Sequence, residues 1–149
     1  MKKFLLLSML IVFLGSCSSL DQKSQVGVKG DWVISNVTYP GSEYIKVTSF
    51  DVADSQCFVG SSWKFVSNSN KGTMSLNNAS CPAFSSPITW MIGKDGTFTL
   101  KITDGEKAKR VTSGYVLQVR NQTESSFQLI DNVSVGGKNV EVVYQFSKM

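Results

Sequence analysis

Length, composition and charge limit what this chain can do. It has 149 residues, a formal net charge of +4, 42% hydrophobic residues and no histidine. Lys2 and Lys3 at the extreme N-terminus supply two of these four net positive charges. The small charge that remains on the rest of the chain does not favour nucleic-acid binding. The lack of histidine excludes a Ser-His-Asp triad and a histidine-ligated metal, and the length fits one domain.

The N-terminus has the layout of a secretory signal. Lys2 and Lys3 precede an apolar run over 4–14, which is too short for a transmembrane helix. The stretch LGSC at 14–17 resembles a bacterial lipobox, which implies cleavage before Cys17 and acylation of its sulfur. We therefore expect residues 1–16 to be a lipoprotein signal peptide. A plain signal peptide with an incidental cysteine is the alternative.

The segment 17–29 is expected to be the lipidated N-terminus and a flexible tether, because it is polar and has little periodicity. The tether would hold the domain 30–149 close to the membrane. In lipoproteins with similar signals, aspartate after the acylated cysteine favours the inner membrane. The signal and Cys17 predict an exported protein that is lipid-anchored in the bacterial envelope. Ser18 in place of aspartate predicts the outer membrane.

The rest of the chain is a series of strand signals. Short runs of β-branched and aromatic residues alternate with turn residues, and the alternation is clearest at 97–103 and 139–147. The predicted strands are 31–40, 43–50, 62–67, 72–77, 87–93, 97–103, 112–121, 126–132 and 139–147. Tight turns favour an all-β, antiparallel up-and-down meander. Closure into a β-barrel of about eight or nine strands would remove its exposed edges.

Two cysteines remain if Cys17 carries lipid. Cys57 and Cys81 lie in the two longest gaps between predicted strands, 51–61 and 78–86. An exported protein meets conditions that permit a disulfide, which here would close a loop of about 25 residues. Two free buried thiols are the alternative. A catalytic thiol is disfavoured because no histidine is present to activate it.

Several motifs resemble a known family. Gly30-Asp31-Trp32 opens the first strand as a Gly-x-Trp motif, which is typical of lipocalins and places Gly30 and Trp32 at the base of the barrel. Together with later stretches, this motif resembles the lipocalin-like lipoproteins of Bacteroidetes-type bacteria over about residues 28–147. Those stretches are CFVGSSWKF (57–65), Gly72, Cys81-Pro82, ITWMI (88–92), AKRVTSGYVLQV (108–119) and YQF (144–146). The chain lacks a second lipocalin motif and a clear C-terminal helix, so the resemblance implies a fold but names no ligand.

The first functional hypothesis is that the barrel binds a small hydrophobic molecule in its interior. Each residue of the expected lining would also serve in an ordinary packed core. The candidate lining is Trp63, Phe65, Trp90, Phe98, Leu100, Tyr115, Leu117, Phe127, Leu129, Tyr144 and Phe146, with Trp32 at the base.

The second hypothesis is a non-enzymatic protein-interaction or inhibitor module with a packed interior. It would present 51–61 and 78–86 to an envelope protein partner. An empty apolar interior would support ligand binding, and a packed interior would support a protein partner at these loops.

No catalytic residue, metal or cofactor is expected. Asp51 and Asp54 are the only close acidic pair near the expected barrel mouth, and solvent-facing loop charges are their simpler interpretation. The stretch VGGKN at 135–139 lies between two predicted strands, so it indicates a hairpin turn and no phosphate-binding loop.

Overall fold

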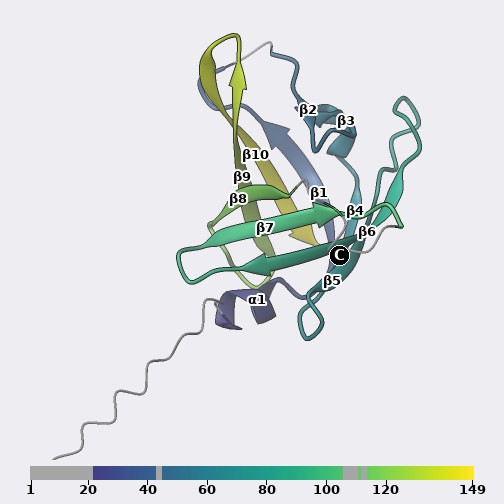
Figure 1. Cartoon of the computed structure of the whole chain (residues 1–149), viewed down its shortest axis with the longest axis vertical. Coiled ribbons are helices and arrows are strands. Elements are labelled where there is room, and N and C mark those ends of the chain that lie inside the picture. Colours follow the sequence, from purple (N-terminus) through teal and green to yellow (C-terminus); the bar gives the residue numbers. More distant parts are fainter. Residues whose placement is uncertain (1–21, 43–44, 106–110, 112–113) are drawn as a thin grey trace, which may run out of the picture.

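The computed structural model describes residues 22–42, 45–105, 111 and 114–149 (Figure 1). Eight antiparallel strands form a closed barrel in the order β1-β10-β9-β8-β7-β6-β5-β4, which confirms the expected fold class. The barrel strands are β1 (Gly30–Thr38), β4 (Ser62–Val66), β5 (Lys71–Ser75), β6 (Ser85–Ile92), β7 (Thr97–Ile102), β8 (Tyr115–Arg120), β9 (Ser126–Val135) and β10 (Lys138–Lys148). The other elements are α1 (Gln22–Val28), β2 (Thr48–Ser49), β3 (Ala53–Asp54) and the 3₁₀-helix η1 (Ser55–Phe58).

Strand β1 closes the barrel because it pairs on both sides. Trp32 lies opposite Trp63 of β4, and Val37 lies opposite Tyr144 of β10. The β1–β10 register shifts between Ile34 and Asn36, and this bulge lets Ile34 and Val37 both be buried. Closure satisfies the backbone groups that an open sheet would leave unpaired at its edges.

Side-chain alternation separates the interior of the barrel from its outer face. In β10, Val140, Val142, Tyr144 and Phe146 are buried, as the sequence predicts. Outside the barrel, Arg120 of β8 and Glu141 of β10 form an ion pair of 3.1 Å. This pair spans β9, whose outward-facing Ile130 is also buried.

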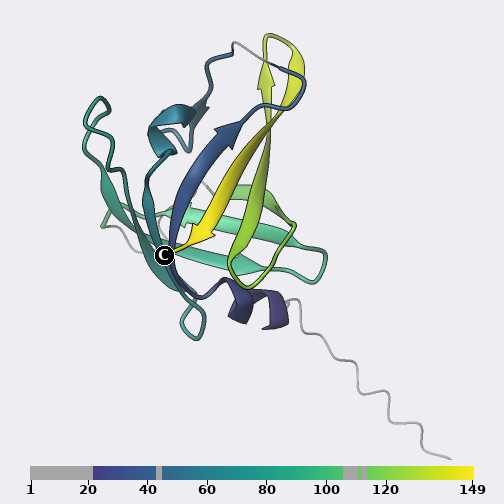
Figure 2. The same cartoon turned by 180° about the vertical axis from the view of Figure 1, so that it is seen from behind.

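Helix α1 lies across one end of the barrel, called here the closed end (Figure 1, Figure 2). Trp32 is fully buried there, and its indole Nε1 donates a 2.7 Å hydrogen bond to the carbonyl oxygen of Val28. The Lys148 ammonium lies 4.7 Å from the centre of the Trp32 ring. Gly30 has a φ of +111°, which side chains other than glycine rarely adopt, and this explains the glycine of the motif.

Part of the expected tether is ordered. Residues 22–28 are helical, although the polar sequence of 17–29 indicated a flexible segment. The reason is local: Val28 is buried, and the Gln25 side-chain amide bridges two strand ends. Gln25 donates to the carbonyl oxygen of Ser67 at 3.3 Å and accepts from the amide of Ile92 at 3.2 Å. Residues 1–21, including the expected signal peptide and Cys17, lie outside the described residues.

The predicted strand 43–50 was wrong. Within its described part only Thr48–Ser49 is a strand, and it pairs with Ala53–Asp54 in a small sheet outside the barrel wall. These elements and η1 lie at the end of the barrel opposite α1, called here the mouth (Figure 1). The chain from Ile45 to Ser61, called here the cap segment, is therefore a cover and not a wall strand.

Candidate functional site

The candidate lining residues converge inside the barrel. All are buried except Tyr115, which is partly exposed. Their burial agrees with inward-facing positions, but burial alone does not distinguish a ligand contact from core packing.

The half of the barrel near the closed end is filled by aromatic side chains. Phe65 of β4 contacts rings from three other strands, with centroid distances of 5.9 Å to Phe98, 6.4 Å to Phe127 and 6.1 Å to Phe146. The Phe127 ring also lies 4.7 Å from the Trp32 ring. Rings from opposite walls thus touch one another, and this half is a packed core.

The half near the mouth is filled by a residue that does not belong to the wall. Phe50, in the cap segment between β2 and β3, is 6% exposed and lies among four aromatic rings. Its ring stacks on Tyr144 with a centroid distance of 5.4 Å and lies 5.2 Å from Tyr115, 5.3 Å from Phe58 and 6.4 Å from Trp63. The sequence analysis missed Phe50 because it read 43–50 as a wall strand.

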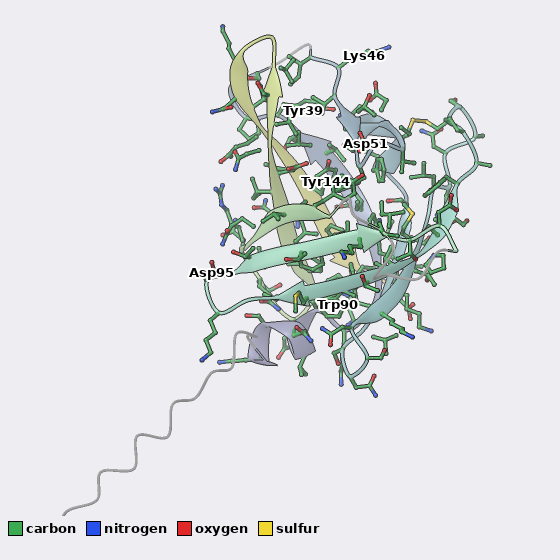
Figure 3. The ribbon with its side chains drawn as sticks, in the orientation of Figure 1. Tyr39, Lys46, Asp51, Trp90, Asp95 and Tyr144 are labelled. Carbon is green, nitrogen blue, oxygen red and sulfur yellow. A yellow bond between two sulfur atoms is a disulfide. The ribbon has the colours of Figure 1, made fainter. Side chains whose placement is uncertain are left out.

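Hydrogen bonds fasten the cap segment to the wall. Ser49 Oγ and the Tyr144 hydroxyl are 2.6 Å apart. The Tyr115 hydroxyl donates to the carbonyl oxygen of Phe50 at 2.8 Å, and a carboxylate oxygen of Asp51 also lies within reach at 3.0 Å. In Figure 3 the labels of Asp51 and Tyr144 lie toward the mouth, and those of Trp90 and Asp95 lie toward the other end. Phe50 and Asp51 both have a φ of +53°, a region that side chains rarely adopt, so the cap segment holds its backbone under strain.

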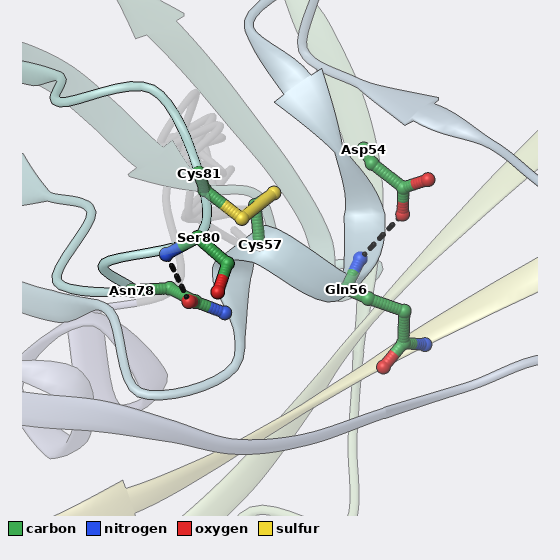
Figure 4. Close-up of a disulfide and its surroundings, with 6 residues drawn as sticks. All are labelled: Asp54, Gln56, Cys57, Asn78, Ser80 and Cys81. Atoms are coloured by element: carbon green, nitrogen blue, oxygen red, sulfur yellow. Dashed lines mark hydrogen bonds between the residues drawn. A yellow bond between two sulfur atoms is a disulfide. The ribbon is translucent and has the colours of Figure 1, made fainter.

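The disulfide holds the cap segment from outside. Cys57 and Cys81 are bonded, which confirms the predicted pairing and rules out two free thiols (Figure 4). The bond joins η1 to the loop between β5 and β6. Asp54 begins η1 as its N-cap, because its carboxylate accepts from the amide of Gln56 at 2.9 Å. The acidic pair Asp51 and Asp54 therefore has local structural partners.

One carboxylate faces the interior near the mouth. Asp131 of β9 lies opposite the fully buried Val142 of β10, and it follows the buried Leu129 by two residues, so it shares their inward face. Burial raises the pKa of Asp131, while a hydrogen bond from the Asn132 backbone acts in the opposite direction. The sequence analysis did not single out this residue because it ended the strand at 132, although the apolar alternation resumes at Val133 and Val135.

Both tyrosines beside Phe50 have a raised pKa. Burial is the largest cause for Tyr115, followed by its hydrogen bond to Asp51, and together with charge they raise its pKa to about 12. Burial is also the largest cause for Tyr144, and its hydrogen bond with Ser49 partly offsets the rise in pKa. The charge of Asp131 adds to the pKa rise of both tyrosines, which places this carboxylate within electrostatic reach of both hydroxyls.

The surface hollows lined by described residues include three that lie outside the barrel and not within it. One is bordered by outward-facing residues of β4 and β5 such as Lys64 and Thr73, and a second by Lys71, Thr89 and Met91. The third lies beside Lys148 at the closed end. Among the described residues, no group of acidic and cysteine side chains is arranged to hold a metal ion. Within the same residues, no helix has the length and apolar character needed to cross a membrane.

Comparison with known proteins agrees with this architecture. Residues 28–129 match the family model described as a lipocalin-like domain. The crystal structure of a lipocalin-like protein from Bacteroides uniformis shares the fold with a TM-score of 0.50 and 12% identity, covering 83% of this chain and 99% of that one. A bovine odorant-binding protein, solved in complex with a selenium-containing odorant, gives a TM-score of 0.46 and 11% identity over 84% of this chain and 72% of that one. A search of curated proteins found no match. Since the family model covers most of the barrel, the chain belongs to the family of lipocalin-like domains.

Proposed function

We propose that this lipocalin-like barrel is a non-enzymatic binding protein for a small hydrophobic molecule, which occupies the mouth half of the interior in place of Phe50. One observation carries this proposal: the ring that fills the mouth half comes from the cap segment and not from the wall. Eight-stranded barrels are wide enough to hold one small ligand when side chains do not fill them.

The surroundings of Phe50 already form a receptor for a ring. The aromatic faces of Tyr144, Tyr115, Phe58 and Trp63 surround it, so a ligand of similar shape would find the same contacts. The backbone of Phe50 is strained at a φ of +53°, and release of that strain lowers the cost of moving it aside. The packed ring cluster around Phe65 limits the ligand to the mouth half and therefore to a small size.

Binding of the neutral fluorescent probe N-phenyl-1-naphthylamine to the chain expressed from its full sequence tests the proposal. We expect saturable binding, and we expect Phe50→Ala to bind about tenfold more tightly, because the variant removes an internal competitor. Phe50→Leu serves as the second variant if Phe50→Ala does not fold. We expect its affinity for the probe to lie between that of the wild type and the tenfold gain expected for Phe50→Ala.

The matched control is Phe127→Ala, which removes a ring of equal size from the packed half. It should leave affinity for the probe close to that of the unmodified protein. Absence of saturable binding to the wild type and to both Phe50 variants would overturn the proposal. An equal gain from Phe127→Ala would mean that loosened packing, and not an emptied mouth, admits the probe.

Membrane attachment is a separate part of the proposal. The lipobox-like LGSC and the preceding apolar run support acylation of Cys17 and anchoring in the bacterial envelope, at the outer membrane. Radiolabelled palmitate should be incorporated into the full chain and not into Cys17→Ala, and the variant should leave the membrane fraction. Equal labelling of both proteins would refute acylation at Cys17.

A protein partner is the second candidate function. The packed half of the interior favours it, and so does the disulfide, which fixes two loops beside each other at the mouth. Residues 77–80 and 82–83 next to Cys81 are exposed and would form the contact surface for an envelope protein. Crosslinking from Asn78→Cys in the intact envelope tests this, with Glu124→Cys in the exposed β8–β9 loop near the closed end as the control.

A further inference from the structure

We propose that the ligand of the mouth half carries a cationic amine, and that Asp131, Tyr144 and Tyr115 form its receptor. This inference rests on the proposed function and adds the chemical class of the ligand.

The first step is the position of the carboxylate. Asp131 faces inward from β9, one inward-facing position nearer the mouth than Leu129, and Leu129 lies opposite Tyr144. Tyr144 in turn stacks on Phe50 with a centroid distance of 5.4 Å. A ligand that takes the place of the Phe50 ring would therefore extend toward Asp131 as it approaches the mouth.

The second step is the lack of a cation beside this carboxylate in the described residues. Among the described residues, the ion pair joins Arg120 to Glu141 on the outer face of the barrel. No basic side chain of the described residues forms an ion pair with Asp131. Asp131 is half-buried, so its carboxylate loses part of its hydration energy, and this loss raises its pKa. A bound ammonium group would restore that energy through a charge-assisted hydrogen bond.

The third step is the supply of further acceptors. An ammonium group has three hydrogens to donate, and a phenolic oxygen can accept one. The Tyr115 hydroxyl lies 2.8 Å from the carbonyl oxygen of Phe50, and the Tyr144 hydroxyl lies 2.6 Å from Ser49 Oγ. Both hydroxyls hold the cap segment, so moving Phe50 aside frees them to face the ligand. One carboxylate and two hydroxyls beside the aromatic rings that surround Phe50 fit an amphiphile with an apolar tail and an amine head.

Competition among three compounds with the same tail tests this inference. Decylamine, decanol and decanoate displace N-phenyl-1-naphthylamine from the chain expressed from its full sequence. We expect decylamine to compete about tenfold more strongly than decanol, and decanoate to compete least. In Asp131→Asn the advantage of decylamine over decanol should disappear, while the affinity for decanol stays within about twofold.

The control is Glu124→Gln, which makes the same change in net charge at an exposed loop position near the closed end. It should keep the preference for the amine. Equal competition by all three compounds, or a preference for the amine that survives Asp131→Asn, would overturn the inference and leave the proposed function standing. Loss of the preference in Glu124→Gln would also overturn it, because net charge would then be the cause. No displacement by any compound, together with no probe binding, would instead reject the proposed function.

Discussion

Gly72 of β5 lies directly opposite Phe65 of β4, at the centre of the aromatic cluster that fills the closed half of the barrel. A Cβ atom added to Gly72 would lie 2.0 Å from the carbonyl oxygen of Lys64, which is backbone and cannot rotate away. The missing side chain at Gly72 therefore allows β4 and β5 to approach closely where the Phe65 ring is most crowded.

Gly72→Ala should reduce the free energy of unfolding by roughly 2 kcal/mol, because the clash forces a strand to shift within a packed core. Chemical denaturation monitored by tryptophan fluorescence measures the change. The matched control is Gly114→Ala, whose new Cβ would have its nearest neighbours at 3.8 Å. A Gly72→Ala variant as stable as the Gly114→Ala variant would contradict this account of the glycine.

Loss of the disulfide should destabilise the fold. The bond joins residues separated by 24 positions, and the loop-entropy model gives about 3.5 kcal/mol for a closed loop of this length. Thermal unfolding of Cys57→Ser should therefore occur at a lower temperature than for the oxidised protein. The reduced wild-type protein should unfold close to the variant. Identical curves for oxidised and reduced protein would show that the bond adds no stability.

The pKa of Tyr115 should fall when the charge of Asp51 is removed. Burial and Asp51 raise this pKa to about 12, and Asp51→Asn leaves the burial but removes the negative charge and weakens the hydrogen bond. Asparagine tolerates the positive φ of +53° at this position, so the backbone should be retained. Ultraviolet absorbance of phenolate as a function of pH measures the shift, and Asp95→Asn at the other end of the barrel is the control.

The same tyrosine predicts how stability responds to alkali. Because the folded-state pKa of Tyr115 is raised to about 12, phenolate forms first in the unfolded chain. Stability is therefore unaffected below the unfolded pKa of about 10, and it falls as pH rises from there to about 12. In Asp51→Asn this alkaline loss should be smaller. A loss of the same size would show that Asp51 does not contribute.

Asp131 should make the protein less stable at neutral pH than an uncharged residue would. Its folded-state pKa lies above the ordinary value of 3.8, so the folded protein holds the proton more firmly than the unfolded chain does. The cost of the charge is present at neutral pH, and it disappears as pH falls through the folded pKa toward 3.8. Asp131→Asn should thus be slightly more stable at neutral pH and unfold at a higher temperature. The gain in the free energy of unfolding should be less than about 1 kcal/mol, because solvent reaches the carboxylate. The difference should vanish near pH 4, and a constant difference across pH would contradict this explanation.

Sequence patterns predicted the wall of the barrel well because local rules specify it. Strand β7 follows strict alternation at Phe98 and Leu100, and Gly96 in the turn before it has a positive φ, as an Asp-Gly pair in a hairpin turn favours. The cysteine pairing also followed from few alternatives, since three cysteines and an expected export signal left one pair.

The cover of the barrel could not be predicted in the same way. The stretch at Phe50 has strand composition, and only the tertiary contacts with Tyr144 and Tyr115 turn it inward on a strained backbone. Helix α1 has a polar sequence, and its order depends on Gln25 meeting the ends of two distant strands. In both cases the deciding partners lie far away in the chain, where periodicity carries no information.

The double pairing of β1 also determines when the protein can fold. Trp32 pairs with Trp63 nearby in sequence, but on its other side it pairs with Lys148, so the first and last barrel strands meet. A growing chain can therefore assemble the meander from β4 to β9 only as an open sheet with a bare edge. That sheet becomes a barrel when β10 arrives. Because this last contact spans almost the whole sequence, its loop-closure cost should make it the slow step of folding and the period of greatest exposure to aggregation.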